Sequence, residues 1–182
     1  MPMTPISRRH WMAAALAAAW LPAAAQAART INWDALVPKD WDPLKDLRAL
    51  MPDQSPGRIA EGSPAEAKMM LELRRLWDAA PTVAELAGQR LRLPGYVVPL
   101  ERAGEQLKEF LLVPYFGACI HSPPPPANQI VLVSLAKPMP LRTMDTVWVT
   151  GTLRIDRSDS PMGVSGYRLE QARSEAYQAE RR

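Results

Sequence analysis

The sequence predicts a mainly β protein, a small five-stranded barrel of the oligonucleotide/oligosaccharide-binding (OB) type preceded by a helical and irregular N-terminal arm. Two observations indicate the barrel. Short apolar runs follow one another between residues 83 and 172, in the number and spacing of about five strands. Gly95 and Gly151 each fall in the middle of one of these runs, where a small barrel needs sharply coiled strands. A β-sandwich is the alternative arrangement of such strands.

Residues 1–27 are typical of an export signal. Arg8 and Arg9 precede the apolar run Met12–Leu21, which is too short to span a bilayer, and Ala25–Ala27 forms an A-x-A cleavage site. The paired arginines fit either a twin-arginine signal or an ordinary Sec signal. By either route we expect the mature chain to lie outside the cytoplasm, in the periplasm of a Gram-negative cell.

Loss of this segment changes the charge of the protein. The full chain of 182 residues carries a formal net charge of +3, and without residues 1–27 it keeps 20 basic against 19 acidic residues, or +1. A nearly neutral chain lacks the basic footprint of a nucleic-acid-binding protein and of a polybasic membrane binder. The single cysteine, Cys119, cannot form an internal disulfide, and no cysteine at the cleavage site can carry a lipid anchor. We therefore expect a soluble product with no nucleic-acid partner.

Residues 28–82 are predicted to form the N-terminal arm. Prolines interrupt its first half, yet that half holds Trp33 and Trp41. Disordered segments are poor in aromatic residues, so these tryptophans indicate an arm that packs on the domain. A short helix is predicted over Asp42–Met51, where leucines recur at helical spacing.

A stronger helix signal begins at Ser63. Serine is a good N-cap, Pro64 suits the first turn, and Glu66 follows three residues after the cap. Pro81 ends the helix. One apolar face is formed by Met69, Leu73, Leu76 and Trp77. We expect this face to pack on the core, and a partner-binding helix is the alternative.

The β domain is predicted over residues 83–172. Pro94 and Gly95 indicate a bulge or kink within its first strand. Residues 173–182 are polar and are predicted to form a frayed or helical tail. The apolar runs are Leu91–Leu100, Phe110–Val113, Ile130–Leu135, Val147–Ile155 and Val164–Ala172.

Three segments carry a resemblance to a known family. They are Leu91–Glu101 (LRLPGYVVPLE), Phe110–His121 (FLLVPYFGACIH) and Pro123–Gln129 (PPPPANQ). Together they resemble the bacterial domain-of-unknown-function 3299 family, whose exported members carry GYVVPLE and GACIHxPPPPxNQ segments, and the resemblance covers roughly Leu86–Ala172. It implies no activity. It does imply an association with ABC-transporter components, some in settings linked to zinc supply, and hence a transporter component as partner.

A metal hypothesis rests on Cys119 and His121. The other histidine, His10, lies in the expected signal, so the mature chain keeps one thiol and one imidazole, two residues apart. In an extended segment both side chains point to one side, and both are zinc and copper ligands. Zinc needs three or four ligands. The hypothesis therefore adds Glu101, or a second chain that completes a Cys₂His₂ site in a homodimer.

The loop has two other interpretations. A polyproline run is rigid and suits protein docking, so the loop either binds a partner protein or fixes the fold, with Cys119 a small core hydrophobe and Phe116 in the core. The docking residues would be Tyr115, Pro123, Pro124, Pro125, Pro126, Asn128 and Gln129. A thiol-dependent enzyme or redox protein using Cys119 is the alternative class, but no catalytic acid–base pair is evident. We expect an accessory binding protein without enzymatic activity.

Overall fold

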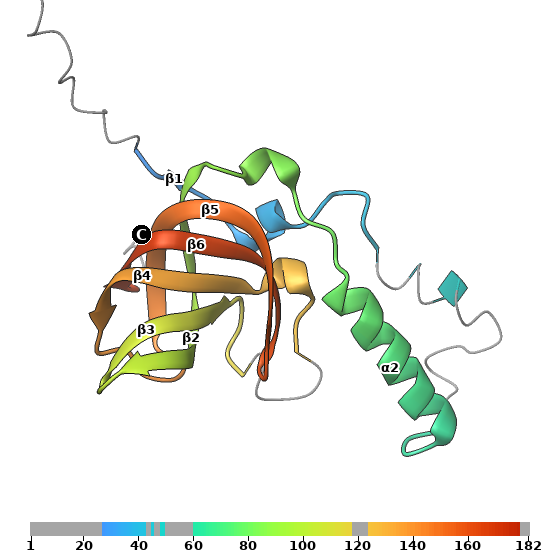
Figure 1. Ribbon diagram of the computed structural model, residues 1–182. Helices are drawn as coiled ribbons and strands as arrows, with labels where there is room; N and C mark the ends of the chain where they lie inside the picture. The colour runs from blue at the N-terminus through green and yellow to red at the C-terminus, as the bar shows by residue number, and fades with distance from the viewer. Residues whose placement is uncertain (1–26, 43–44, 46–47, 50–59, 118–123, 179–182) are drawn as a thin grey trace, which may run out of the picture.

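The computed structural model describes residues 27–42, 45, 48–49, 60–117 and 124–178 (Figure 1). Cys119, His121 and Pro123 lie outside the described residues, as do residues 1–26 of the expected export signal and most of the helix predicted over residues 42–51. Within the part that is described, no helix is long and apolar enough to cross a membrane.

Five strands close into a barrel. They are β2 (Arg90–Ala103), β3 (Gln106–Val113), β4 (Val131–Met139), β5 (Thr146–Ser160) and β6 (Gly163–Ala176). The strand order is β2-β3-β4-β6-β5, and β5 pairs back onto β2. The β4–β6 pair is parallel, and the other barrel pairs are antiparallel. The short β1 (Arg29–Thr30) adds in parallel to β2. The predicted mainly β, OB-like barrel is confirmed, and the β-sandwich is not found.

The barrel closes because apolar side chains alternate along its strands and the two mid-strand glycines let strands approach. A Cβ atom at Gly95 would lie 2.8 Å from the Val113 carbonyl oxygen, and one at Gly151 would lie 2.9 Å from the Glu170 carbonyl oxygen. Side chains at these positions would therefore force the strands apart. The interior is filled mainly by Leu91, Leu93, Val97, Leu107, Phe110, Leu112, Val131, Val133, Val149, Leu153, Tyr167 and Leu169.

All five strands extend beyond their predicted apolar runs. The largest difference is at β5, which ends at Ser160 and not at Ile155. Strand β6 ends at Ala176 and not at Ala172, so the first four residues of the predicted tail belong to the barrel. Those residues pair with Val147–Thr150 of β5. Strand ends rich in exposed polar residues have no apolar alternation, and the prediction therefore stopped too early.

Helix α2 (Pro64–Asp78) begins as predicted. The Ser63 hydroxyl oxygen accepts a hydrogen bond from the Glu66 backbone N–H at 3.1 Å, and the Glu66 carboxylate accepts one from the backbone N–H of Gly62. The prediction that its apolar face packs in the core is wrong, since no residue of α2 is buried and the helix projects from the barrel (Figure 1). A closed barrel surrounds its own interior and leaves no apolar face for this helix to cover.

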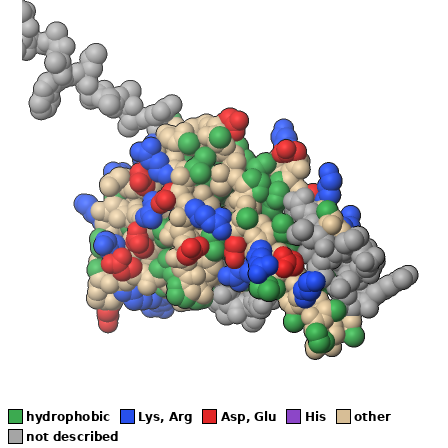
Figure 2. Space-filling model, turned by 45° about the vertical axis from the view of Figure 1, so that its right-hand side comes forward, with side chains coloured by type: hydrophobic (Ala, Val, Ile, Leu, Met, Phe, Trp, Pro, Cys, Tyr) green, Lys and Arg blue, Asp and Glu red, His purple; other side chains and the backbone are tan. Residues whose placement is uncertain are grey.

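Acidic and basic side chains are interspersed over the face in Figure 2, with no field of a single sign. Around the barrel, the described residues also form three short 3-10 helices. They are η2 (Trp33–Leu36), η4 (Ala84–Leu86) and η5 (Ala127–Gln129).

Candidate functional site

The segment between β3 and β4 leaves the barrel at Val113 and returns through η5. Asn128 is fully buried, and its amide Nδ2 donates to the Pro81 carbonyl oxygen at 3.0 Å. The Gln129 amide Nε2 donates to the Trp33 carbonyl oxygen, also at 3.0 Å. Both side chains, predicted as part of a docking loop, thus join the barrel to the N-terminal arm.

Tyr167 holds the arm from the barrel interior. Its side chain is fully buried, and its hydroxyl donates to the Leu36 carbonyl oxygen at 2.8 Å while accepting from the Val83 backbone N–H at 2.6 Å. Burial raises the pKa of the Tyr167 hydroxyl above its ordinary value of 10.0, and the carboxylate of Glu85 acts in the same direction. Sequence reasoning took Tyr167 only as a strand residue. The available signal was that a buried tyrosine needs a partner for its hydroxyl.

The arm packs as predicted. The Trp33 indole Nε1 donates to the Pro94 carbonyl oxygen at 2.7 Å, and Trp41 packs against the cluster of Ala80, Ala127 and Val164. The structure describes three prolines of the polyproline run. Pro125 is buried, while Pro124 and Pro126 are half-buried. The return path of the loop is therefore fixed against the arm and the barrel.

The outgoing end of the same loop is exposed. Tyr115 is 54% exposed and Phe116 is 71% exposed. The Phe116 ring packs edge-on against Tyr96, with ring centroids 5.9 Å apart and planes at 83°. The expectation that Phe116 belongs to the core is wrong, because the core is already closed when β3 ends at Val113.

A small pocket of 220 Å³ adjoins these rings. Its lining consists mostly of aromatic residues and prolines. The full set is Trp33, Pro94, Gly95, Tyr96, Pro114, Thr146 and Tyr177. Tyr177 is held in place by stacking on Trp148, with ring centroids 5.4 Å apart. We call Tyr96, Tyr115, Phe116 and this pocket the aromatic surface. Sequence reasoning missed its full extent because Trp33, Tyr96 and Tyr177 are distant in the chain.

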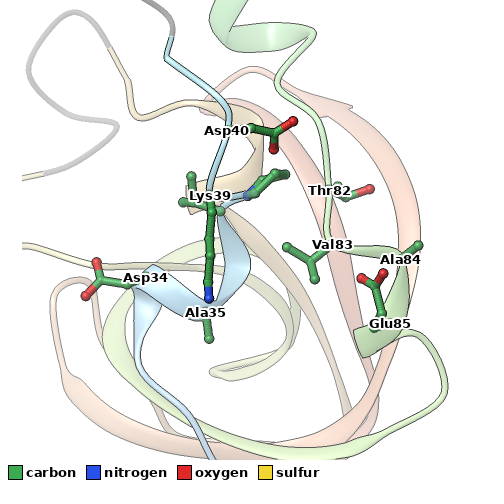
Figure 3. Close-up of a pocket in the computed structure, with 10 residues that line it drawn as sticks. Asp34, Ala35, Lys39, Asp40, Thr82, Val83, Ala84 and Glu85 are labelled. Carbon is green, nitrogen blue, oxygen red and sulfur yellow. The ribbon is translucent and has the colours of Figure 1, made fainter.

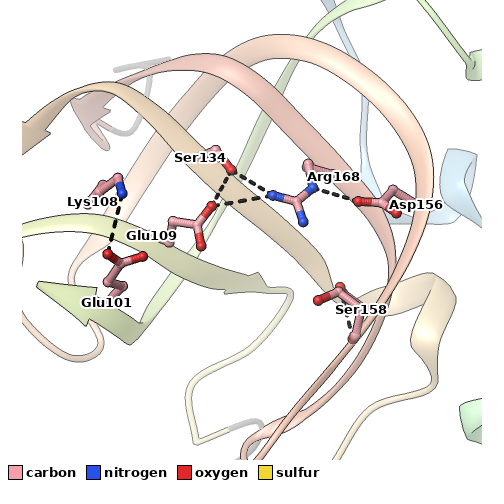
Figure 4. Close-up of polar contacts among 8 residues, drawn as sticks. Glu101, Lys108, Glu109, Ser134, Asp156, Ser158 and Arg168 are labelled. Atoms are coloured by element: carbon pink, nitrogen blue, oxygen red, sulfur yellow. Dashed lines mark hydrogen bonds and ion pairs between the residues drawn. The ribbon is translucent and has the colours of Figure 1, made fainter.

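The predicted metal ligand Glu101 lies at the β2–β3 hairpin. Its carboxylate forms an ion pair with the Lys108 ammonium at 3.3 Å, and both side chains are exposed (Figure 4). Glu101 pairs with Glu109 across the hairpin. Glu109 lies four residues before Val113, the last residue of β3 before the loop. This separates Glu101 from the start of the loop by about 13 Å, because a strand rises roughly 3.3 Å per residue. The described residues contain no cluster of three or more histidine, cysteine, aspartate or glutamate side chains that could hold a metal ion.

A polar network lies on the outside of the barrel (Figure 4). The Arg168 guanidinium contacts Asp156 at 2.7 Å, Ser134 at 3.0 Å and Glu109 at 3.3 Å, and the Ser134 hydroxyl donates to Glu109 at 2.6 Å. This serine lies between a carboxylate and a guanidinium, and the described residues contain no histidine that could serve as its imidazole base. The network connects β3, β4, β5 and β6.

A cleft of 470 Å³ lies between residues 34–40 of the arm and residues 82–85, which lead into and form part of η4 (Figure 3). Asp34, Asp40 and Glu85 contribute carboxylates and Lys39 an ammonium. The carboxylates point in different directions and do not converge on one position (Figure 3). The cleft therefore lacks the geometry of a metal site.

Comparison with known proteins agrees with the segments described above. The family described as "Protein of unknown function (DUF3299)" matches residues 33–176. The chain belongs to this family. It is similar to the crystal structure of a DUF3299 family protein from Pseudomonas aeruginosa PAO1, with 33% identity, a TM-score of 0.60, and coverage of 84% of this chain and 99% of that chain. No curated protein matches.

The family match is longer than the resemblance found in the sequence. It begins at Trp33 and ends at Ala176, so it includes the first part of the arm and the whole of β6. The arm contacts made by Asn128, Gln129 and Tyr167 thus all lie within the family domain. The arm and the barrel are accordingly one family unit.

Proposed function

We propose that this protein is an exported, non-enzymatic binding protein that docks a component of a membrane-transport system on its aromatic surface. The observation that carries the proposal is the exposure of Tyr115 and Phe116 side by side, at 54% and 71%, directly after a fully buried stretch of β3. The segment 1–27, with its cleavage pattern, supports export to the periplasm.

The dimensions of the aromatic surface favour a protein partner over a small ligand. Ligand pockets usually enclose about 300–1,000 Å³, and the pocket beside Tyr96 is smaller, at 220 Å³. A pocket of this size suits one anchoring side chain of a partner. Aromatic residues dominate protein–protein binding energy, and burying a phenylalanine side chain contributes about 1.5–3 kcal/mol.

The rigid frame supports the same function. Phe116 is braced by Tyr96, and the return of the loop is fixed by Asn128 and Gln129. A surface that is ordered before binding loses less conformational entropy when the partner docks. The exposed rings therefore have a fixed platform behind them.

We expect Phe116→Ser to weaken partner binding at least tenfold. Intact mass first establishes that the periplasmic protein lacks residues 1–27. Tagged wild type, Phe116→Ser and the control Ile155→Ser are then each purified from the solubilised cell envelope, and the proteins recovered with them are compared. Ile155 is also exposed, at 43%, but lies on β5. A transport component should be recovered with wild type and Ile155→Ser and depleted with Phe116→Ser. Equal recovery with all three proteins would refute the proposal.

Zinc binding at Cys119 and His121 is the second candidate, supported by their spacing in the sequence. Glu101 would be the third ligand only if it left Lys108, so a second copy of the chain is the more direct source of ligands. We expect zinc to promote dimerisation, and affinity to fall as the pH drops through the ordinary imidazole range near 6.5. Zinc titration with light scattering on wild type, Cys119→Ser and His121→Ala measures both effects. Identical affinities for the three proteins would exclude this site.

A further inference from the structure

The barrel opens between β4 and β6. These parallel strands pair as far as Leu135 and Ala172 and then diverge. On its other side, β4 also departs from β3, because the pairing moves from Glu109–Ser134 directly to Leu107–Met139. Ala136, Lys137 and Pro138 thus have no ladder partner on either neighbouring strand. On β6, Arg173 and Ser174 pair with β5 alone.

A groove of 460 Å³ occupies this opening, at the end of β4 opposite to η5 and the loop (Figure 1). Its walls are mostly small or apolar, with Ala136, Pro138, Met139, Ala172 and Ser174 beside the two cations Lys137 and Arg173. Ser174 is 7% exposed, and its hydroxyl oxygen is buried with no hydrogen-bond partner in the described part of the chain. The groove therefore presents a free strand edge with an unsatisfied polar group next to it.

The charge of the groove is positive. Lys137 and Arg173 are exposed, and neither forms an ion pair with any of the described residues. The nearest acidic residue along β6, Glu175, is already engaged by Arg92 at 3.6 Å. Two unpaired cations at an open strand edge favour a ligand that carries carboxylates.

We propose that this groove binds an acidic peptide in extended conformation, which adds as a strand to the open edge of β6 at Arg173–Ala176. Backbone hydrogen bonds to β6 would supply most of the affinity, as in other cases of strand addition. Lys137 and Arg173 would select glutamate or aspartate side chains on the peptide. The site is separate from the aromatic surface, and its test uses different variants.

The test is a fluorescence-anisotropy titration of the mature protein with a labelled peptide of alternating valine and glutamate. Three comparisons isolate the proposed contacts. The Lys137→Glu/Arg173→Glu variant removes the cations, and Arg157→Glu/Lys68→Glu makes the same change of charge on β5 and α2, at exposed residues that do not line the groove. An N-methylated version of the peptide keeps its carboxylates but lacks the backbone N–H groups that strand addition needs.

We expect the peptide to bind wild type and the control variant with affinities within about threefold of each other. The Lys137→Glu/Arg173→Glu variant and the N-methylated peptide should each show binding at least tenfold weaker. Absence of binding to wild type overturns the proposal. So does equal binding of the N-methylated peptide, which leaves the protein unchanged and would indicate charge attraction alone. An equal loss of peptide affinity in the control variant would also overturn the proposal.

Discussion

Gly151→Val is expected to lower the free energy of unfolding by about 1–3 kcal/mol, the usual range for overpacking a well-packed interior, or by more. A Cβ atom at this position would lie 2.9 Å from the Glu170 carbonyl oxygen and 3.3 Å from the side chains of Leu169 and Ala172. The contact at 2.9 Å is with backbone, which cannot rotate away as a side chain can. Insertion of valine therefore requires β5 and β6 to move apart.

Urea unfolding followed by circular dichroism measures this effect. Arg157→Val on the same strand is the matched control, because Arg157 is exposed and forms no ion pair within the described residues. A surface change of this kind should stay within about 0.5 kcal/mol of wild type. If Gly151→Val unfolds at the same urea concentration as the control, then β5 and β6 do not approach each other closely at Gly151.

Tyr167→Phe is expected to destabilise the protein by about 1–3 kcal/mol and to loosen the arm first. The phenylalanine ring fills the same space, but the Leu36 carbonyl oxygen loses its donor and the Val83 N–H loses its acceptor. Amide hydrogen exchange should therefore accelerate at Leu36 and Val83 more than in the centre of the barrel. Exchange and stability equal to those of wild type would show that Tyr167 does not hold the arm.

The same residue predicts a dependence of stability on pH. The folded protein raises the pKa of Tyr167 above 10.0, so the folded state holds the phenolic proton more tightly than the unfolded chain does. This contribution is fully present below pH 10 and is lost as the pH rises through the folded-state pKa. Wild type should consequently lose stability above pH 10 more steeply than Tyr167→Phe does.

The sequence predicted the barrel because barrel strands carry a local signal. Apolar runs marked all five strands, and Gly151 within one run indicated the close approach that the structure contains. Local signals also predicted the start of α2 at Ser63. The position of α2 could not be predicted, since periodicity identifies an apolar face without showing what covers it.

The contacts around the loop were less predictable because they join distant parts of the chain. Asn128 reaches Pro81 over 47 positions, Gln129 reaches Trp33 over 96, and Tyr167 reaches Leu36 over 131. No pattern in the loop itself separates an amide that joins two segments from one that binds a ligand. Phe116 illustrates the same limit, because an aromatic residue beside an apolar strand resembles core until the strand is known to end at Val113.

Photocrosslinking at position 116 tests the central claim most directly. The photoreactive residue p-benzoylphenylalanine replaces Phe116 in one protein and Ile155 in the control, and both are irradiated in intact cells. The proposed function predicts a defined adduct with a transport component from position 116 and none from position 155. The absence of an adduct at position 116, or the same adduct from both positions, would contradict a docking role for the aromatic surface.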